Sequence, residues 1–535
     1  MPSDYEQIRK DNIFEYGNAT HHLELLSAHY TNRTHFIFEL LQNAEDAKAS
    51  RILFTLYDDR LEVTHDGRIF NEQDVKGICG VGEGTKADDL TQIGKFGIGF
   101  KSVYVYTSAP EIFSGDEHFR IEHYVRPYEV EPKEIEEPWT TRFVLPFDRE
   151  DFNSEIAFQE IGERLRNLNS IAILFLRNIK EIEFRLLGAY GVYRRHDVDA
   201  EEHMRQVSIG AERENWLIFE RPIPVPDSNH QVRVEVAFKL ETDLVGNIDK
   251  IRKIHESPLF VYFPTERNTR LGFLIQGPYR TTLGRDNIPS DDTWNKQLIA
   301  ETATLVVESM HRLKELDLLT VSLLETLPIR VEDFVQGGLF HPIFSRARDA
   351  FINEELLPAN DGTFVSAKNA KLARGNPTRN LLNHQQLGNL FDATNEIKWL
   401  SGEITQNLTP ELYNFLMKLD VDEVRPRLFF SKLSDQFLAK QSDEWFISFY
   451  KFLSTHFREL RDDLPTRPIL RLQDRTHVNP SPEGARPNAY LPIGMGNDTV
   501  LPIIKERLIK DEEVREFLRN GLKVPEWDIV EEVIK

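Results

Sequence analysis

Hydrophobic and polar residues follow two different periods in the first part of the chain. Between residues 34 and 50 the apolar positions recur three or four residues apart, which predicts an amphipathic helix. Residues 51–59 and 60–65 alternate between apolar and polar positions, which predicts two strands joined by a turn. Residues 77–99 are rich in glycine and predict a long loop, and residues 100–106 predict a helix after it.

The middle of the chain shows the same two periods. Residues 153–170 and 292–315 have the apolar spacing of helices, and the second of these closes a block rich in strands. After residue 316 the predicted helices become shorter and are broken by proline, and no repeat of fixed period is visible. The remaining expected strands are residues 111–115, 118–125, 140–147, 179–187, 191–195, 216–223, 231–240, 259–264 and 270–279.

These elements predict an α/β (α+β) protein of three parts. We expect an α/β sandwich over residues 1–165, a second α/β domain over 166–318 and a mainly helical region over 319–535. A division into about three or four domains is also what 535 residues suggest. Residues 523–535 begin a further helix without a stop signal, so we expect this chain to be the front part of a longer protein.

Composition places the chain among globular proteins. It is 40% hydrophobic and 28% charged, which excludes a disordered chain. Cys79 is its only cysteine, so no disulfide forms within the chain. No segment reaches the roughly 20 apolar residues of a membrane helix, and the N-terminus lacks an apolar signal core. We therefore expect a soluble, cytoplasmic protein that does not associate with a membrane.

The net charge of −22 argues against general attraction to nucleic acid. A local basic groove remains an alternative, because phosphate contacts need only a patch of positive charge. We interpret the basic clusters as ordinary surface charge. They comprise Arg177, Lys180, Arg185, Arg194 and Arg195 in one segment, and Lys250, Arg252, Lys253, Arg267, Arg270, Arg280 and Arg285 in another.

The first candidate for chemistry is the helix predicted from residue 34. Glu39, Asn43 and Asp46 are spaced by four and three residues, so they share one face of that helix. An amide oxygen such as that of Asn43 binds Mg²⁺ without adding charge. A carboxylate one turn away can orient or deprotonate a water molecule. The alternative is a solvated helix face, and this segment alone does not decide between the two.

Two further elements supply a carboxylate and exposed backbone. Asp66-Gly67 follows a predicted strand, where the carboxylate can accept a hydrogen bond from an adenine amino group; a plain Asp-Gly turn is the alternative. Gly94, Gly97 and Gly99 precede a predicted helix, so phosphates could approach the backbone there. The sequence has no P-loop pattern and no dinucleotide fingerprint after a first strand.

Taken in this order, the three elements resemble the motifs of the gyrase, heat-shock chaperone, histidine kinase and MutL (GHKL) ATPase superfamily. The matching segments are ELLQNAEDA (39–47), HDGRIF (65–70) and GKFGIGF (94–100), and Thr141 resembles the threonine of a fourth motif. The likeness covers about residues 15–150 and is greatest to the sacsin-like and Hsp-ninety-like branches. It implies a Bergerat-type ATP-binding fold with ATP and Mg²⁺ as ligands.

The resemblance also implies a role for each matching residue. Glu39 would be the general base, Asn43 the Mg²⁺ ligand and Asp66 the residue that reads adenine, while residues 77–94 would form a lid. The second motif departs from the common Asp-x-Gly-x-Gly form, because Gly67 follows Asp66 directly. The nucleotide contacts implied in this way are Asn43, Asp46, Asp66, Gly67, Lys86, Gly94, Phe96, Gly97, Ile98, Gly99, Phe100 and Thr141.

A segment far downstream resembles the part of the chaperone middle domain that sends an arginine to the γ-phosphate. This segment, QGPYRTTLGRDNIP, makes Arg285 the candidate and Arg280 the second choice. An arginine there would stabilise the charge that develops during phosphoryl transfer. A surface arginine in a loop is the alternative.

Two functions follow from the resemblance. The first is an ATPase in which hydrolysis drives a lid or dimer switch in a chaperone-like or clamp-like protein, with a homodimer and an unidentified protein client as partners. Bacterial or antiviral defence and DNA maintenance are compatible settings by fold analogy only. The second is a nucleotide-sensing module without turnover in a larger assembly. A histidine kinase is disfavoured, and we interpret His21, His22 and His65 as structural or surface residues.

Overall fold

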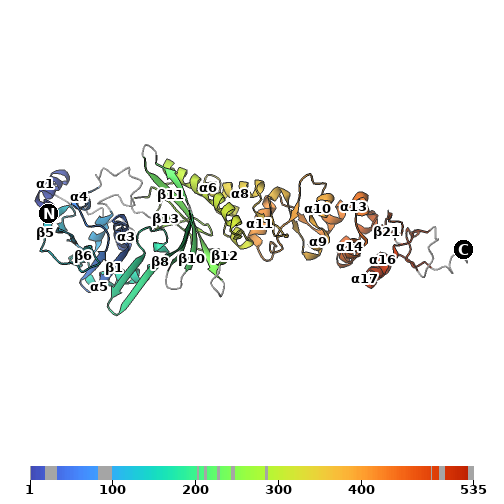
Figure 1. The fold of residues 1–535 in the computed structure, drawn as a ribbon, viewed down its shortest axis with the longest axis horizontal. Coiled ribbons are helices and arrows are strands. Elements are labelled where there is room, and N and C mark those ends of the chain that lie inside the picture. The colour runs from blue at the N-terminus through green and yellow to red at the C-terminus, as the bar shows by residue number, and fades with distance from the viewer. Residues whose placement is uncertain are drawn as a thin grey trace. The chain divides into compact units, whose positions relative to one another are not determined.

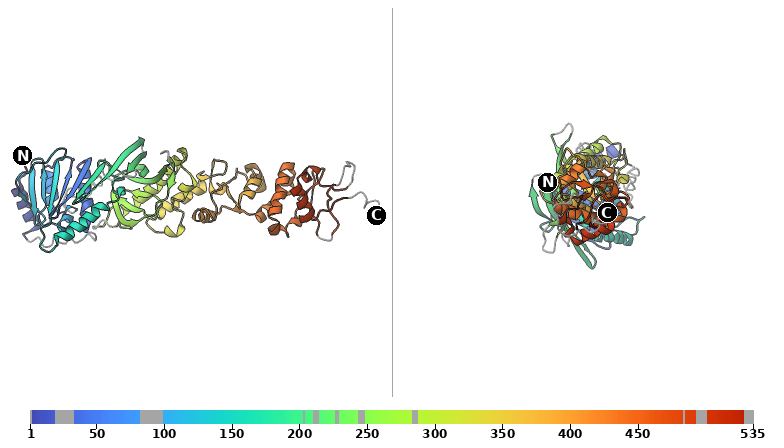
Figure 2. Two further views of the ribbon diagram at one scale, coloured as in Figure 1. Left: turned by 90° about the horizontal axis from the view of Figure 1, so that it is seen from below. Right: turned by 90° about the vertical axis from the view of Figure 1, so that its right-hand side faces the viewer.

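The computed structural model divides the chain into two compact units, Met1–Ala347 and Arg348–Lys535. Their elements are labelled in Figure 1, and Figure 2 gives two further views. Within the described residues no helix is long and apolar enough to cross a membrane. The structure describes residues 2–18, 33–81, 99–201, 204–209, 214–225, 229–242, 248–282, 287–482, 485–492 and 501–527.

The first unit is built on one large mixed sheet, so the predicted mixed α/β class is confirmed. Its fifteen strands run in the order β14-β13-β15-β11-β10-β9-β8-β7-β1-β2-β6-β3-β4-β5, with β12 beside β11. The strands are β1 Arg51–Leu56, β2 Arg60–His65, β3 Glu111–Ser114, β4 Glu117–Glu122, β5 Arg126–Glu129, β6 Thr141–Pro146, β7 Glu181–Leu186, β8 Ala189–Glu201, β9 Met204–Ile209, β10 Glu214–Pro224, β11 Gln231–Thr242, β12 Ile248–Arg252, β13 Pro258–Val261, β14 Phe263–Asn268 and β15 Leu274–Gln276.

The long strand β8 joins the two halves of this sheet. It pairs antiparallel with β7 through residues 189–194 and with β9 through residues 195–201. The predicted boundary near residue 165 therefore lies inside one compact unit with a continuous sheet. Sequence alternation predicted only residues 191–195 of β8 and missed β9.

The helices of the first unit cover this sheet. Helix α3 carries the apolar side chains Phe36, Ile37, Leu40 and Leu41 into the same core as β1 and β2, as its spacing predicts. The predicted helix over 292–315 is confirmed as α6, with Asp292 as its N-cap. The helical elements are α1 Tyr5–Tyr16, η2 Arg33–His35, α3 Phe36–Asp46, α4 Glu72–Cys79, η3 Phe100–Val105, α5 Ser154–Arg166, η4 Ser170–Ile173, α6 Thr293–Glu315, α7 Val321–Leu324 and η5 Val331–Asp333.

One predicted loop begins later than expected. Residues 77–79, assigned from their glycine content to a loop, form the last turn of α4. The Asn71 side chain accepts from the backbone N–H of Asp74, the Asp74 side chain accepts in return, and Val75 and Ile78 bury the inner face. This capping box and apolar face outweigh the low helix propensity of Gly77.

The second unit consists of short helices and small sheets. The strands pair as β16-β17, β19-β18-β20 and β21-β22. Helix α8, His341–Asn353, leads into this unit. Its elements are β16 Leu357–Pro358, β17 Phe364–Val365, η6 Ala367–Asn369, β18 Ala370–Ala373, α9 Asn376–Leu381, α10 His384–Leu390, β19 Lys398–Trp399, α11 Pro410–Lys418, β20 Glu423–Val424, α12 Pro426–Lys432, α13 Asp435–Ala439, α14 Asp443–Thr455, α15 Phe457–Leu460, η7 Leu464–Thr466, β21 Leu470–Arg471, β22 His477–Val478, α16 Glu506–Ile509, α17 Glu512–Glu516 and the π-helix η8 Phe517–Gly521.

The second unit contains the same turn twice, which the sequence did not reveal. In the first copy Asp361 Oδ1 accepts from the backbone N–H and hydroxyl of Thr363, at 3.1 and 2.6 Å. In the second copy Asp474 Oδ1 accepts from the same two groups of Thr476, at 2.9 and 2.7 Å. The residue between them has a positive φ in both copies. Each turn joins a two-stranded hairpin in the same register.

The strands around each turn are repeated as well. Ala359 forms an antiparallel bridge to Leu400, and Leu472 forms the equivalent bridge to Ile504. Two parallel pairings follow in each copy: Lys371 with Trp399 and Leu372 with Glu423, then Tyr490 with Ile503 and Leu491 with Glu526. The offset between equivalent residues is not constant, so a search at fixed period does not detect this pair of modules.

Candidate functional site

The predicted polar stripe of α3 lies on the least buried side of that helix. Asn43 and Asp46 are partly exposed, whereas the other residues of α3 are buried. Glu39, one turn before Asn43, is 3% exposed. His35 Nε2 lies 3.7 Å from Glu39 Oε1. The amide of Asn43 is therefore open to a ligand, whereas the carboxylate of Glu39 is held in a confined position.

Glu39 directly contacts the described end of the glycine-rich segment. A Cβ placed on Gly99 would lie 1.9 Å from Glu39 Oε2. Because the φ of Gly99 is −60°, an ordinary helical value, glycine is required there by space and not by backbone conformation. The first and third motifs of the sequence therefore meet at the N-terminal half of α3.

Asp66 and Gly67 lie at the opposite end of α3. Asp66 Oδ1 accepts from the backbone N–H groups of Ser50 and Arg51, at 2.7 and 2.9 Å, and its Oδ2 accepts from the Ser50 hydroxyl. A Cβ on Gly67 would lie 2.7 Å from the carbonyl oxygen of Ala47, just after α3. These three donors leave Asp66 about one of the four acceptor positions of a carboxylate.

The threonine of the fourth predicted motif is buried beside Asp66. Thr141 pairs with His65 in the sheet, and its hydroxyl lies 2.6 Å from the Ser114 hydroxyl. Its neighbour Thr140 was not predicted, yet its hydroxyl donates to the carbonyl of Gly67. Because Thr141 is fully buried and bonded to Ser114, Thr140 is the threonine that directly supports the Asp66-Gly67 turn.

His65 is a buried structural residue, as predicted. Its Nδ1 accepts from the backbone N–H of Gly67 at 3.1 Å, and its ring lies near Phe143. Burial lowers the pKa of His65 to about 4. Phe100, by contrast, was predicted to contact nucleotide, and its side chain is 3% exposed and packs against Phe143 in the core. Any contact of residue 100 with a ligand would have to come from its backbone.

Lys101 is a functional candidate that the sequence did not single out. Its side chain is fully buried, and its Nζ donates to the carbonyls of Ile78 and Tyr124 at 2.7 and 2.5 Å. Burial lowers the pKa of Lys101 to about 8. This ammonium group therefore ties the end of α4 and the turn before β5 to η3.

Of the two arginines predicted to reach the γ-phosphate, the structure describes the second choice. Arg280, the second choice for the catalytic arginine, is described: it lies 3.4 Å from Asp292 and 53% of its side chain is exposed. Its backbone N–H donates to Asn295 Oδ1 at 2.7 Å, and this bond anchors the backbone of residue 280 to α6. The predicted site residues outside the described part of the chain are Lys86, Gly94, Phe96, Gly97, Ile98 and Arg285.

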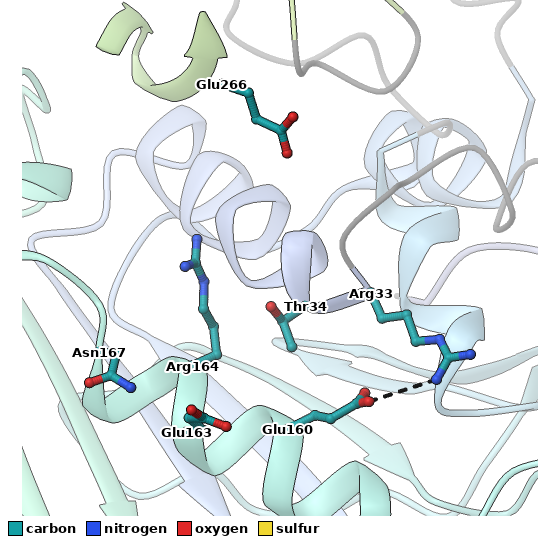
Figure 3. Close-up of a pocket in the computed structure, with 7 residues that line it drawn as sticks. All are labelled: Arg33, Thr34, Glu160, Glu163, Arg164, Asn167 and Glu266. Carbon is teal, nitrogen blue, oxygen red and sulfur yellow. Dashed lines mark ion pairs between the residues drawn. The ribbon is translucent and has the colours of Figure 1, made fainter. Parts of the chain in front are cut away.

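A separate cavity of about 820 Å³ lies beside α3. Figure 3 shows Arg164 of α5 and Glu266 of β14 extending into it from opposite sides, while Arg33 pairs with Glu160 at 3.7 Å. The guanidinium of Arg164 lies 4.8 Å from the ring centroid of Phe38, which is on a different face of α3 from Glu39. The cavity is lined by Arg33, Thr34, Glu160, Glu163, Arg164, Asn167 and Glu266.

Comparison with known proteins finds a family match for the first part of the chain. Residues 18–123 match the Sacsin domain. The chain is 27% identical over 345 residues to Protein NO VEIN of Arabidopsis thaliana, covering 59% of this chain and 12% of that protein. It is 35% identical over 105 residues to Sacsin of Homo sapiens, covering 16% of this chain and 2% of that protein. The predicted sacsin-like resemblance is thus confirmed for this domain, and the chain spans only a small part of either relative.

Proposed function

We propose that the chain binds ATP with Mg²⁺ on a Bergerat-type site along α3, as in the GHKL superfamily, and hydrolyses the nucleotide. The observation that carries the proposal is that α3 touches Gly99 at one end of its polar stripe and lies against Gly67 at the other. Residues 39 and 46 are about 10 Å apart along a helix axis, a span that suits an extended nucleotide. Adenine would lie at Asp66 and the phosphates at Glu39 and Gly99.

The residues present fit the proposed ligands. Asp66 retains acceptor capacity for an adenine amino group. The partly exposed amide of Asn43 is a suitable oxygen ligand for Mg²⁺, with phosphate and water oxygens completing the shell. The cation would neutralise phosphate charge. Glu39, one turn from Asn43, would hold and polarise the attacking water.

Hydrolysis would drive a conformational switch in a chaperone-like or clamp-like protein, with Arg285 stabilising the transferring phosphoryl group. A second candidate, a module that holds nucleotide without turnover, is favoured by the 3% exposure of Glu39, because such a buried base has little access to water. The two functions share the binding site and differ only in whether the bound nucleotide is consumed.

The deciding experiment measures Mg·ATP binding by calorimetry and phosphate release in parallel. Glu39→Ala should bind ATP within about threefold of the wild type and lose turnover by about a hundredfold or more, the usual scale for a general base. Glu72→Ala is the matched control, because Glu72 lies on the exposed side of α4 and its ion pair within the described residues is with Lys76. Asn43→Ala should lose the Mg²⁺-dependent part of binding.

Each outcome of this experiment has one meaning. Equal turnover in Glu39→Ala and the wild type would remove Glu39 as the base. Binding by the wild type without phosphate release would favour the nucleotide-holding module. A wild type that binds no ATP would contradict both candidate functions.

A further inference from the structure

We propose that Glu45 and Arg177 are positioning residues that couple α3 to strands β10 and β11. Nucleotide bound along the Glu39–Asp46 side of α3 would then change the stability of these strands. The inference rests on the proposed function for its ligand. Its evidence is a separate set of contacts, made by a different face of the same helix.

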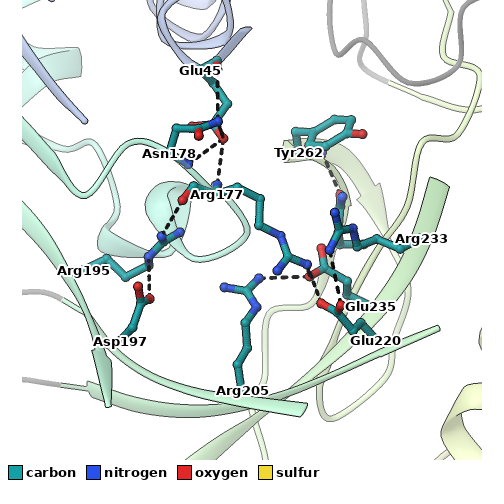
Figure 4. Close-up of polar contacts among 11 residues, drawn as sticks. Glu45, Arg177, Asn178, Arg195, Asp197, Arg205, Glu220, Arg233, Glu235 and Tyr262 are labelled. Atoms are coloured by element: carbon teal, nitrogen blue, oxygen red, sulfur yellow. Dashed lines mark hydrogen bonds and ion pairs between the residues drawn. The ribbon is translucent and has the colours of Figure 1, made fainter. Parts of the chain in front are cut away.

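Glu45 fixes the C-terminal end of α3 to the segment before β7. The residue is 4% exposed, and its carboxylate accepts from the backbone N–H groups of Arg177, Asn178 and Ile179, at 2.7, 2.9 and 2.9 Å. The Asn178 side chain adds a fourth bond at 3.0 Å. Figure 4 shows the contacts of Glu45 with Arg177 and Asn178. A buried carboxylate with four donors cannot shift without leaving buried N–H groups unpaired, so α3 and this segment must move together.

Arg177 continues the connection into the second half of the sheet. Its Nη2 lies 2.5 Å from both Glu220 of β10 and Glu235 of β11. These two glutamates are directly opposite each other in the antiparallel register. Like charges in that position repel, and the guanidinium between them removes the repulsion. Arg177 therefore links β10 and β11 to a segment whose backbone is held by α3.

The surrounding groups hold Arg177 in place. Arg205 donates to Glu235 at 2.9 Å, and the 4% exposed Arg195 donates to the carbonyl of Arg177 at 3.1 Å. Arg177 and Arg195 were interpreted from the sequence as surface charge. That interpretation is wrong for Arg195, which is 4% exposed, whereas the side chain of Arg177 is 33% exposed. Both belong to a network in which four arginines face four carboxylates. The network comprises Arg177, Arg195, Arg205, Arg233, Glu45, Asp197, Glu220 and Glu235.

The same strands are connected along the chain to the segment that contains the candidate arginine. Glu235 is paired in register with Gln276, the last residue of β15, and Gln276 Oε1 accepts from the backbone N–H of Tyr262 at 2.8 Å. The chain then continues through residues 277–282 toward Arg285, which lies outside the described residues. A second contact of α3 supports the same side of the sheet, because the rings of Phe38 and Phe263 are 5.1 Å apart.

Coupling of this kind is reciprocal and can be measured. We would follow hydrogen exchange in the full chain with and without a non-hydrolysable Mg·ATP analogue. In the wild type the analogue should slow exchange in α3 and, by about fivefold or more, in residues 217–220 and 234–237 of β10 and β11. Arg177→Met keeps the aliphatic stem and loses the charge. This variant should bind the analogue as the wild type does, but the analogue should slow exchange in α3 and not in β10 or β11.

Arg233→Met is the matched control, because Arg233 contacts one of the two glutamates, Glu220, at 3.2 Å in the described part of the chain, and 47% of its side chain is exposed. It should keep the nucleotide-dependent slowing in both strands. If the role of Arg177 were merely structural, Arg177→Met would raise the exchange rates of the strands equally with and without nucleotide. The ratio of the rate without nucleotide to the rate with nucleotide would then stay as in the wild type. Retention of that ratio in Arg177→Met would overturn the inference.

The remaining outcomes separate this inference from the proposed function. If the wild type binds the analogue but its hydrogen exchange slows only in α3, the coupling is contradicted and the proposal of ATP binding still stands. A wild type that binds no analogue contradicts the proposed function itself. If Arg177→Met does not fold, Arg177→Lys replaces it, since lysine keeps the charge but has a shorter side chain and lacks the planar guanidinium group. That variant should lose at least half of the slowing in β10 and β11, and full retention would again overturn the inference.

Discussion

The Cα of Gly99 lies so close to the carboxylate of Glu39 that a methyl group on residue 99 would overlap Glu39 Oε2. Two segments sixty residues apart in the sequence therefore specify one contact. A side chain on residue 99 would displace the Glu39 carboxylate, so the base that we propose is positioned by the segment that we expect to cradle phosphate.

Gly99→Ala should displace Glu39 and reduce turnover by about tenfold or more, the scale of a displaced general base, while the chain remains folded. Alanine suits the backbone angles of residue 99, so the effect would come from the clash alone. Gly388→Ala is the control, because a Cβ there meets no atom within 4 Å. It should stabilise α10 by about 0.5–1 kcal/mol and leave turnover unchanged. Steady-state phosphate release and thermal unfolding measure both effects, and normal turnover in Gly99→Ala would contradict the arrangement.

Asp66→Asn should weaken ATP binding, because it removes the charge that strengthens the bond to the adenine amino group. The structure adds a second effect that the sequence did not suggest. Asp66 also accepts from Ser50 and Arg51, so the variant should lose about 1–3 kcal/mol of stability. Ser50→Ala removes the hydroxyl donor and keeps the carboxylate, so it should be less stable but bind ATP normally. Calorimetry showing equal affinity in Asp66→Asn would exclude Asp66 from the adenine site.

Acid should destabilise the first unit through His65. Burial lowers the pKa of His65 from 6.5 to about 4, so below pH 6.5 the unfolded chain binds a proton that the folded chain does not. The contribution is complete above pH 6.5 and is lost as the pH falls toward 4, by about 3 kcal/mol in all. His65→Asn keeps an acceptor for the Gly67 N–H and cannot titrate. Its unfolding free energy should fall less than that of the wild type between pH 7 and 4, and parallel curves would contradict this assignment.

The two equivalent turns of the second unit should respond unequally to the same substitution. Asp474→Ala removes the bonds to Thr476 and should cost about 1 kcal/mol. Asp361→Ala should cost more, because Asp361 also lies 3.3 Å from His384 and 3.5 Å from Lys398. Urea unfolding of the two variants provides the comparison. Equal losses would show that these ion pairs contribute nothing measurable.

Local patterns were sufficient to predict the elements that carry the candidate site. Helix α3 and the hairpin β1–β2 have clear periodicity, and the polar stripe of α3 is where the spacing of Glu39, Asn43 and Asp46 predicts it. The end of α4 was mistaken for a loop because glycine content was weighed above the capping box at Asn71.

Contacts between residues far apart in the chain could not be predicted from the sequence. Nothing local marks Glu45 as the partner of residues 177–179, or Arg177 as the bridge between Glu220 and Glu235. Glu45 and Glu235 have the charge that is typical of surface residues, but both are buried in the fold. The parallel pairing of β1 with β7, which joins residues 51–55 to 181–185, has no signal of its own either.

The duplicated turn provides a rule for recognising this module in other chains. Both copies keep an aspartate, a residue with positive φ and a threonine, and both pair a later strand with a glutamate, Glu423 or Glu526. Side chains elsewhere differ, and the two copies share one hydrophobic core. The two copies therefore share the atoms that accept and donate in the turn and differ in the spacing between the paired strands. A search for Asp-x-Thr between short apolar strands, followed at variable distance by such a glutamate, would find further copies of this arrangement.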